Sequence, residues 1–253
     1  MPGLMVVLPT YNERENLPSM VDALFALPVD DLSVLVVDDN SPDGTGALAD
    51  TLAEAHPGRL TVLHRQEKNG LGPAYIAGFQ RALELGAETI VQMDADFSHQ
   101  PKYILDMLAL IERGNDLVIA SRFAPGGSVD ESWSIYRKAL SWFANRVYVR
   151  TLLGISIHDA TAGYRMWRRQ TLIGLGLDRI RSNGYVFQVE MAYVASRLGF
   201  HVAELPIYFP DRKQGTSKMD ARIQIEAALR VWQVMYRHHA LNPQMRRSQV
   251  VTT

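Results

Sequence analysis

The chain has 253 residues, 47% of them hydrophobic and 21% charged, a composition that fits a globular protein with ample material for a core. It contains no cysteine, which excludes disulfides and thiolate metal sites and favours a reducing compartment. The first residues lack the basic region of a signal peptide, and no run approaches the roughly 20 apolar residues of a membrane span. We therefore expect a chain that is soluble by itself.

The net charge of −1 conceals an uneven distribution of charge along the chain. Residues 1–116 carry 18 acidic side chains against 7 Lys and Arg, whereas residues 117–253 carry 9 acidic side chains against 19 Lys and Arg. The first half therefore suits a cation, and the second half suits an anion or an anionic surface. Because so much of the chain is acidic, nucleic acid is a poor candidate partner.

Short apolar runs alternate with amphipathic segments through the first half of the chain. This alternation predicts an α/β fold, in which a mostly parallel sheet carries helices on both faces. The first helix is expected to begin at Asn12, with Glu15 three residues later as in a capping box, and to end near Leu27. The other elements expected here are strands at 4–8, 32–37, 60–64, 89–93 and 117–120 and helices at 46–54, 73–85 and 101–113.

The second half of the chain is less regular. No repeat and no linker divides it from the first half, so we expect a single domain over residues 1–241 and a disordered tail over residues 242–253. The elements expected in this half are helices at 136–153, 185–198 and 223–235 and a strand at 202–205.

Polar residues follow three of the expected strands, at Tyr11–Glu13, at Asp38-Asp39 and at Asp94–Asp96. In open parallel sheets, ligands bind beyond the carboxyl ends of the strands. Two carboxylates one residue apart suit Mg2+ or Mn2+ together with substrate phosphates, although such a pair is also common in solvated loops. A carboxylate at Asp39 could accept from the N–H edge of guanine or uracil, with Tyr11 as a stacking face. A sugar nucleotide therefore fits this edge.

Several histidines and tryptophans allow two interpretations. His99 could be a metal ligand, but its place before a helix that starts with proline makes a capping or surface role equally plausible. The sequence His158-Asp159 is better interpreted as a turn than as a catalytic dyad, because adjacent side chains diverge. His238 is expected at the surface. Trp133 and Trp142 are expected either in the core or facing an apolar ligand.

Five segments of the chain resemble the inverting family-2 glycosyltransferases of GT-A fold, and among them the dolichyl- or polyprenyl-phosphate mannose synthases. These segments are PTYNE (9–13), VVDDNSPDGT (36–45), MDADFSHQP (93–101), SRF (121–123) and NGYVFQVE (183–190). The resemblance implies a Rossmann-like sheet and transfer of mannose from GDP-mannose to a polyprenyl phosphate, with inversion and with Mg2+ or Mn2+. It also implies a nucleotide-sugar and metal half at 1–125 and an acceptor-binding half at 126–241.

Carried over position by position, the resemblance implies a set of site residues. The nucleoside would be held by Pro9, Tyr11, Glu13, Val37 and Asp39. The metal would be held by Asp94 and Asp96, with the Ala95 backbone also at the diphosphate. The cations that contact the donor would be Arg122, Arg212 and Lys218. The acceptor phosphate would be bound by Arg122, Arg137 and Ser141. The residues expected to act in the transfer itself are Asp96, Arg122, Arg137 and Arg212.

One position departs from the family pattern, which has a glutamine two residues beyond the second acid. This chain has Ser98 there, so the third metal ligand stays open and water could supply it.

Three alternatives remain open at this point. The first is a related synthase that uses another donor, such as UDP-glucose. The second is a sugar-phosphate nucleotidyltransferase, whose glycine-rich triphosphate loop is not matched by the acidic segment 9–13. The third is a non-catalytic membrane-recruitment partner. Because the acceptor is a lipid, we expect peripheral binding to the cytoplasmic face of a membrane through residues 136–153 and the basic C-terminal half, alone or with a membrane-protein partner.

Overall fold

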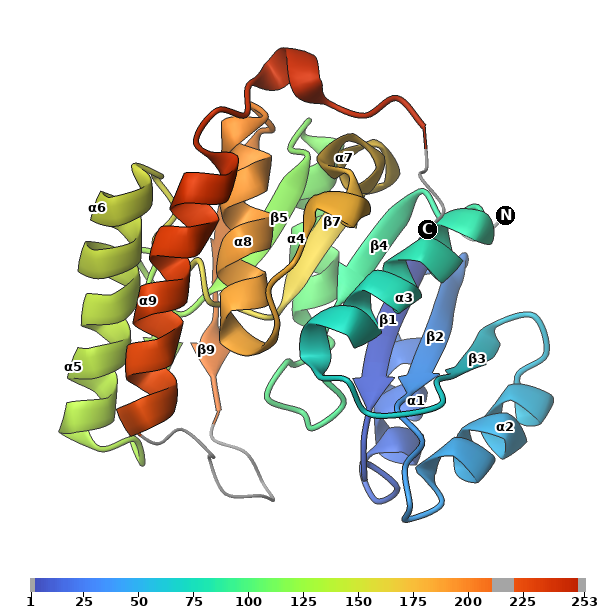
Figure 1. Ribbon diagram of the computed structural model, residues 1–253. Coiled ribbons are helices and arrows are strands. Elements are labelled where there is room, and N and C mark those ends of the chain that lie inside the picture. Colours follow the sequence, from blue (N-terminus) through green and yellow to red (C-terminus); the bar gives the residue numbers. More distant parts are fainter. Residues whose placement is uncertain (1–2, 211–220, 250–253) are drawn as a thin grey trace.

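The computed structural model describes residues 3–210 and 221–249, and within these ranges all side chains except those of Arg137 and residues 221–227. The described residues form a seven-stranded sheet of order β3-β2-β1-β4-β7-β5-β8 (Figure 1). All neighbouring strands are parallel except β7, which runs antiparallel to both β4 and β5. The strands are β1 (Leu4–Thr10), β2 (Leu32–Asp38), β3 (Leu60–His64), β4 (Thr89–Gln92), β5 (Leu117–Ser121), β7 (Arg165–Arg168) and β8 (Val202–Pro206). The expected mostly parallel sheet is confirmed.

Helices cover both faces of this sheet and bury its apolar side chains in two clusters. Continuous apolar runs such as β2, in which every residue is buried, are typical of parallel strands covered on both faces. One cluster lies against α1 (Leu17–Phe25), α2 (Thr45–Ala55) and α4 (Tyr103–Glu112). The other lies against α3 (Leu71–Glu84), α7 (Arg169–Leu175) and α8 (Gly184–Arg197).

Outside α8 lies a further layer formed by the second half of the chain. Helix α9 (Ala221–His238) packs on α8, and a long helical segment runs beside α9 (Figure 1). This segment covers the helix expected at 136–153, but it is interrupted: α5 (Ile135–Phe143) continues into the π-helical turn η1 (Ala144–Val149) and then α6 (Arg150–Leu153). The remaining short elements are β6 (Ser128–Val129), β9 (Tyr208–Phe209), η2 (Leu177–Arg179) and η3 (Pro243–Met245).

The first helix begins later than the sequence indicates. Asn12 has a φ of 61° and its N–H donates to Ser41 Oγ at 3.1 Å, so it belongs to a loop rather than to a helix cap. Helix α1 begins at Leu17, with Asn16 as its N-cap and a proline in its first turn. The predicted cap at Asn12 was wrong because its loop is fixed by a residue 29 positions away.

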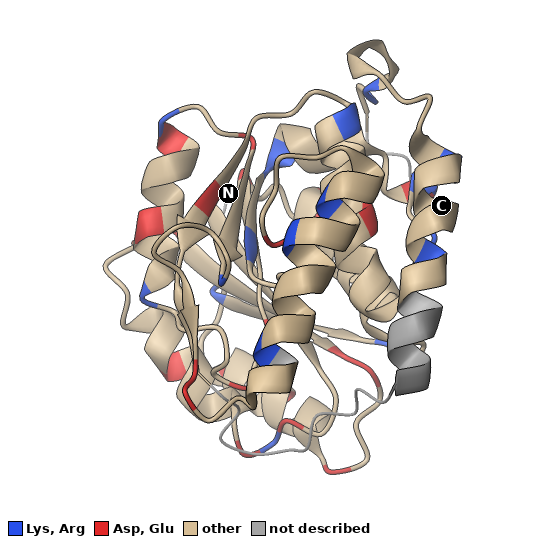
Figure 2. Ribbon diagram, turned by 90° about the vertical axis from the view of Figure 1, so that its left-hand side faces the viewer, with Lys and Arg blue, Asp and Glu red and all other residues tan. Residues whose placement is uncertain are grey.

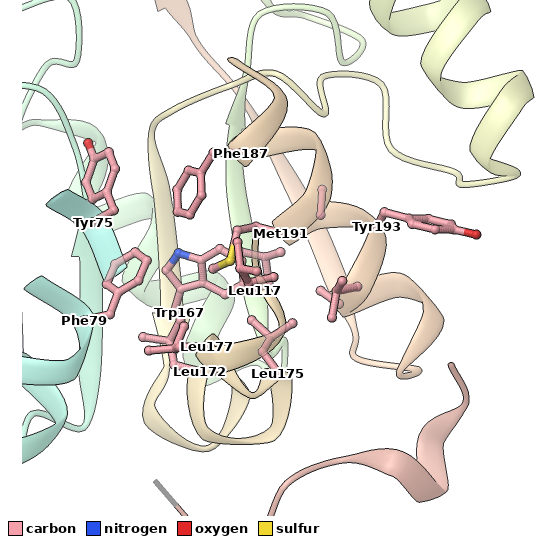
Figure 3. Packing of buried hydrophobic residues seen from close by; sticks show 14 of the residues in the cluster. Tyr75, Phe79, Leu117, Trp167, Leu172, Leu175, Leu177, Phe187, Met191 and Tyr193 are labelled. Carbon is pink, nitrogen blue, oxygen red and sulfur yellow. The ribbon is translucent and has the colours of Figure 1, made fainter. Parts of the chain in front are cut away.

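Strand β7 was not expected from the sequence. Its four residues include two arginines, and the Arg165 side chain is fully buried. On the face of the sheet that α3 covers, the Trp167 ring of β7 packs edge-on against the Phe79 ring, with 6.4 Å between the ring centroids. The Trp167 Nε1 donates to Gln92 Oε1. Figure 3 shows Trp167 at the centre of the aromatic residues of this cluster. A strand of four residues with two arginines has no clear sequence pattern, and it is defined only by its pairing with β4 and β5.

The described part of the expected tail contacts the helices. In residues 242–249, Arg246 donates to the carbonyl groups of Leu198 and Gly199, and the Arg247 side chain pairs with Asp178 at 3.0 Å. These contacts hold the segment against the ends of α7 and α8. Residues 250–253 lie outside the described residues.

Glu190 of α8 anchors α9. Its carboxylate is fully buried and accepts from the backbone N–H groups of Arg181 and Ser182, from Arg237 at 2.6 Å and from His238 Nε2 at 2.8 Å. Burial opposes its ionisation, but these hydrogen bonds outweigh burial and lower the pKa of Glu190 to about 2. His238, expected at the surface, is instead buried as one of these donors.

Glu190→Gln should change how the stability of the protein depends on pH. The carboxyl group binds a proton near pH 4.5 when unfolded but only near pH 2 when folded, so its contribution is complete above pH 4.5 and is lost as the pH falls towards 2. The two pKa values correspond to about 3 kcal/mol. Urea unfolding should therefore show a stability difference between native protein and variant that is largest above pH 5 and shrinks towards pH 2.

The matched control is Glu84→Gln, which removes an exposed carboxylate that pairs with Arg81 across one helical turn. It should leave the acid dependence close to that of the native protein. A difference between native protein and Glu190→Gln that stays constant from pH 7 to pH 2 would contradict the prediction.

Candidate active site

The polar segments that follow β1, β2 and β4 come together at one edge of the sheet. These three strands are parallel neighbours in the order β2-β1-β4, so their carboxyl ends coincide. In Figure 2, acidic residues colour the loops along the lower edge, towards which β1 and β2 run in Figure 1. The expected site residues of the first half are therefore brought together.

The two acids at the end of β2, Asp38 and Asp39, make different contacts. Asp38 accepts from the Thr10 hydroxyl at 3.0 Å and from the Ser41 hydroxyl at 2.6 Å, which fixes the loops that follow β1 and β2. Asp39 is buried and pairs with Arg65. Burial raises the pKa of Asp39, although the Arg65 charge opposes this shift. Asp38 thus fixes the two loops, whereas Asp39 binds a cationic side chain.

Cations that the sequence analysis did not identify complete this end of the site. Arg65 bonds Asp39, and the Lys68 ammonium lies 3.5 Å from the centre of the Tyr11 ring. Of the other expected nucleoside residues, Pro9 and Val37 are directly paired between β1 and β2. Glu13 accepts from Asn16 at 2.8 Å, and its N–H donates to the Thr45 hydroxyl.

The central pair of acids is held by hydrogen bonds from helix α3 and from the loop itself. Asp94 Oδ1 accepts from the Tyr75 hydroxyl at 3.0 Å, and the Asp94 N–H donates to His99 Nδ1 at 2.8 Å. Asp96 Oδ1 accepts from the N–H and the hydroxyl of Ser98, at 3.0 and 2.6 Å. Burial, with the Asp94 charge, raises the pKa of Tyr75 well above its usual value, so Tyr75 stays a donor. The site thus orients both carboxylates.

These contacts bear on two of the open interpretations, the roles of His99 and Ser98. His99 is buried, and because its Nδ1 accepts from the backbone of Asp94 it positions the acidic loop from behind. Ser98, at the position of the family's glutamine, is also buried and orients Asp96. The described residues contain no group of three His, Cys, Asp or Glu able to hold a metal. Two oriented carboxylates that leave further positions to substrate phosphates and water fit Mg2+ or Mn2+ well.

Arg122, after β5, is paired with a residue that the sequence analysis treated as part of a turn. Its Nε and Nη2 donate to the two oxygens of the fully buried Asp159, at 2.8 and 2.7 Å. Burial opposes the charge on Arg122, but Asp159 outweighs burial and raises the pKa of the guanidinium above its usual value. Asp159 is itself fixed because Glu204 of β8 accepts from its N–H and from His158. Arg122 is therefore charged and fixed in its orientation.

The other expected cations are only partly visible. Arg137 and Ser141 both lie on α5, but the side chain of Arg137 is outside the described set. Arg212 and Lys218 also lie outside the described residues. Of the two tryptophans expected either in the core or facing an apolar ligand, Trp133 is buried and Trp142 is 48% exposed.

The segment 183–190, which carried part of the resemblance, has structural tasks. Asn183 Oδ1 accepts from the Gly72 N–H at 3.1 Å and so fixes the start of α3, the helix that carries Tyr75. Gln188 accepts from Gln92 at 2.7 Å, directly below the acidic loop. Together with Glu190, which binds α9, these residues connect helix α8 to α3 and to α9.

Residues 5–176 match the family model "Glycosyl transferase family 2". The chain belongs to this family. It is 49% identical over 228 residues to the polyprenol monophosphomannose synthase of Mycolicibacterium smegmatis, covering 90% of this chain and 84% of that protein. It is 48% identical over 229 residues to the undecaprenyl-phosphate mannosyltransferase of Micrococcus luteus, covering 90% and 92%. The resemblance inferred from the motifs is confirmed, and the protein is a family-2 glycosyltransferase.

Solved structures support the fold. The glucosyl-3-phosphoglycerate synthase of Mycobacterium tuberculosis, crystallised with Mn2+, UDP-glucose and phosphoglyceric acid, superposes with a TM-score of 0.66 at 18% identity, covering 94% of this chain and 80% of that one. The same enzyme has been crystallised with Mg2+ and UDP, with a TM-score of 0.63 at 19% identity. At this identity the likeness shows the fold alone, and the expected GT-A fold is confirmed.

Tyr75→Phe should weaken metal binding at the acidic pair. The variant keeps the ring, which stacks on Phe79 and Phe187, but removes the hydroxyl that fixes Asp94. Loss of such an orienting contact typically costs about 10-fold or more in metal affinity. Titration of Mn2+ in the presence of GDP, followed by calorimetry, measures the change.

The matched control is Tyr148→Phe, which removes a hydroxyl that donates to the Ala228 carbonyl between η1 and α9. It should bind Mn2+ as the native protein does. Equal Mn2+ affinity in Tyr75→Phe and native protein would show that the Tyr75 hydroxyl does not orient a metal ligand.

Proposed function

We propose that this enzyme transfers mannose from GDP-mannose to a polyprenyl phosphate, with inversion at the sugar carbon, and forms a polyprenyl-phosphate β-mannose. The observation that carries the proposal is the identity of nearly half of all residues, over 90% of the chain, with two relatives whose names specify polyprenol monophosphomannose synthesis and mannosyl transfer to undecaprenyl phosphate. The geometry of the site is consistent with each part of this reaction.

The nucleoside would lie beside Asp39 and Tyr11. The Asp39 carboxylate can accept from the ring N–H and the amino group of guanine, and the Tyr11 ring offers a stacking face. Arg65 pairs with Asp39, and its charge opposes the upward shift that burial imposes on the pKa of this carboxyl. Pro9, Val37 and Glu13 would complete this end of the donor site.

Asp94 and Asp96 would hold the divalent cation, Mg2+ or Mn2+, with the Ala95 backbone beside the diphosphate. When bound, the cation would neutralise the charge that develops on the leaving diphosphate. The residues of this chain supply the orientation: Tyr75 and Ser98 hold the two carboxylates, and His99 holds the backbone between β4 and the loop.

The acceptor phosphate is already anionic at neutral pH, so the reaction needs no general base. The difficulty is to bring a phosphate anion close to a diphosphate, which requires cations on the acceptor side. Arg122 would serve this task, and its pairing with Asp159, which fixes the orientation of the guanidinium group, supports the proposal. Arg137 and Ser141 of α5, together with Arg212 and Lys218, would add the remaining contacts to the two phosphates.

The lipid acceptor would be reached by peripheral binding to the cytoplasmic face of a membrane. Helices α5–α6 and α9 run side by side (Figure 1) and expose large apolar side chains. These are Ile135, Tyr136, Trp142, Phe143 and Val147, with Leu229, Trp232 and Tyr236 of α9. Residues 135–153 contain four Lys or Arg and no acid, which suits an anionic lipid surface. None of the helices in the described part of the chain is long and apolar enough to cross a membrane.

Transfer of labelled mannose from GDP-mannose to a short polyprenyl phosphate tests the reaction. Product should form with Mg2+ or Mn2+, disappear with EDTA, and fall by about 100-fold or more in Asp96→Asn, because the diphosphate charge is then no longer neutralised. The control is Asp106→Asn, on the exposed side of α4, which should retain native activity. Product from UDP-glucose but not from GDP-mannose would replace the donor, and no transfer from any donor would overturn the enzymatic proposal.

Sedimentation with anionic vesicles tests the membrane surface. The native chain should sediment with vesicles that contain phosphatidylglycerol, and Trp142→Ser with Trp232→Ser should abolish most of this binding because two half-exposed indoles are lost. Leu105→Ser, an exposed apolar residue on α4 at the opposite face of the sheet, serves as the control. Failure of the native chain to bind vesicles at low salt would favour recruitment by a membrane-protein partner.

A further inference from the structure

The π-helical turn η1 carries a buried asparagine, Asn145, that links it to the loop after α6. Asn145 Nδ2 donates to the Ser141 carbonyl at 3.1 Å and to the Thr161 hydroxyl at 3.0 Å, and its Oδ1 accepts from the Thr161 N–H at 3.1 Å. The side chain is only 2% exposed. Its amide is thus fully used inside the protein. Single π-helical turns within longer helices frequently occur at functional sites.

The contact continues from Thr161 to Arg122. The Thr161 hydroxyl accepts from Arg122 Nη2 at 2.9 Å and donates to Asp159 Oδ1 at 3.3 Å. One hydroxyl has a single donor and two acceptor positions, and here all three are used. Arg122 is therefore held by Asp159 and Thr161 together, and Thr161 is held by Asn145.

This chain of contacts connects two parts of the site that are distant in sequence. At one end is α5, which carries Ser141 and Arg137, the residues expected at the acceptor phosphate. At the other end is Arg122, after β5, which the proposed function places among the phosphate-binding cations. A continuous network of packed and hydrogen-bonded groups is the physical basis on which two sites can influence each other.

We propose that Asn145 is a positioning residue of the transfer reaction, which fixes the Arg122 guanidinium through Thr161 and so ties its position to the acceptor helix. The inference rests on the proposed function. Displacement of a catalytic group by about 1 Å can cost roughly 100-fold in rate, so a contact that fixes Arg122 has a measurable effect.

Asn145→Leu and Thr161→Val test the proposal, because each keeps the shape of the side chain and removes the hydrogen bonds. We expect kcat for mannosyl transfer to fall by about 10-fold or more in both, as for the loss of one or two hydrogen bonds, while calorimetric affinity for GDP with Mn2+ stays within about 2-fold. Tyr148→Phe, which removes a hydrogen bond from the same turn but towards α9, should keep native kcat.

A double-mutant cycle distinguishes positioning from a general loss of stability. If Asn145 acts through Arg122, then Asn145→Leu should lower kcat strongly in the native background and by less than about 2-fold in an Arg122→Lys background. Additive losses, or a kcat in Thr161→Val equal to native, would overturn the proposal. If Asn145→Leu does not fold, the cycle is made with Thr161→Val, which is read in the same way.

A second measurement keeps this inference separate from the proposed function. The 15N NMR signal of Arg122 Nε, assigned by its absence in Arg122→Lys, reports the orientation of the guanidinium without any substrate. It should shift in Asn145→Leu and Thr161→Val but not in Tyr148→Phe. An unshifted signal overturns the positioning role, whereas a shift in a chain that transfers no mannose overturns only the proposed reaction.

Discussion

The buried pair of Arg122 and Asp159 is the interaction on which the arrangement of the site depends. In the proposed reaction the Arg122 guanidinium would meet substrate phosphates, for which it has to be both charged and fixed. The bidentate contact with Asp159 supplies both properties. Asp159 is fully buried, and its backbone N–H donates to the Glu204 carboxylate, which holds it in place. Removing one member would leave the other buried without its partner, which is far more costly than losing a surface ion pair.

The uneven distribution of charge along the chain follows the two groups of proposed site residues, the acids of the first half and the cations of the second. The acidic first half places Asp39 and the pair Asp94–Asp96 at the ends of neighbouring strands, where a cation and a nucleoside can be bound. The basic second half contains Arg122 with its partner Asp159, and helix α5 with Arg137. Strands β7 and β8 of the second half lie in the same sheet as the strands of the first, so the two halves form one folded unit.

Several buried polar groups form a support beneath the acidic loop. Tyr75, His99 and Ser98 each donate to or accept from the loop, and they come from α3 and from the loop itself. On the far side, Glu190 fixes α9 to α8. The hydrogen-bonding capacity of these buried groups is used by one another. His99, which the sequence offers as a candidate metal ligand, therefore has a structural role in positioning the acidic loop.

The sequence by itself determined the strands β1 to β5, most of the helices, and the acids at the strand ends, because apolar runs and turn residues act locally. It also identified the family from its motifs. The tertiary structure alone decided that Asp159 pairs with Arg122, that β7 enters the sheet antiparallel, and that His238 is buried against Glu190. These partners lie 37 and 48 residues apart in the two pairs, and only the order of strands and the packing of helices brings them together.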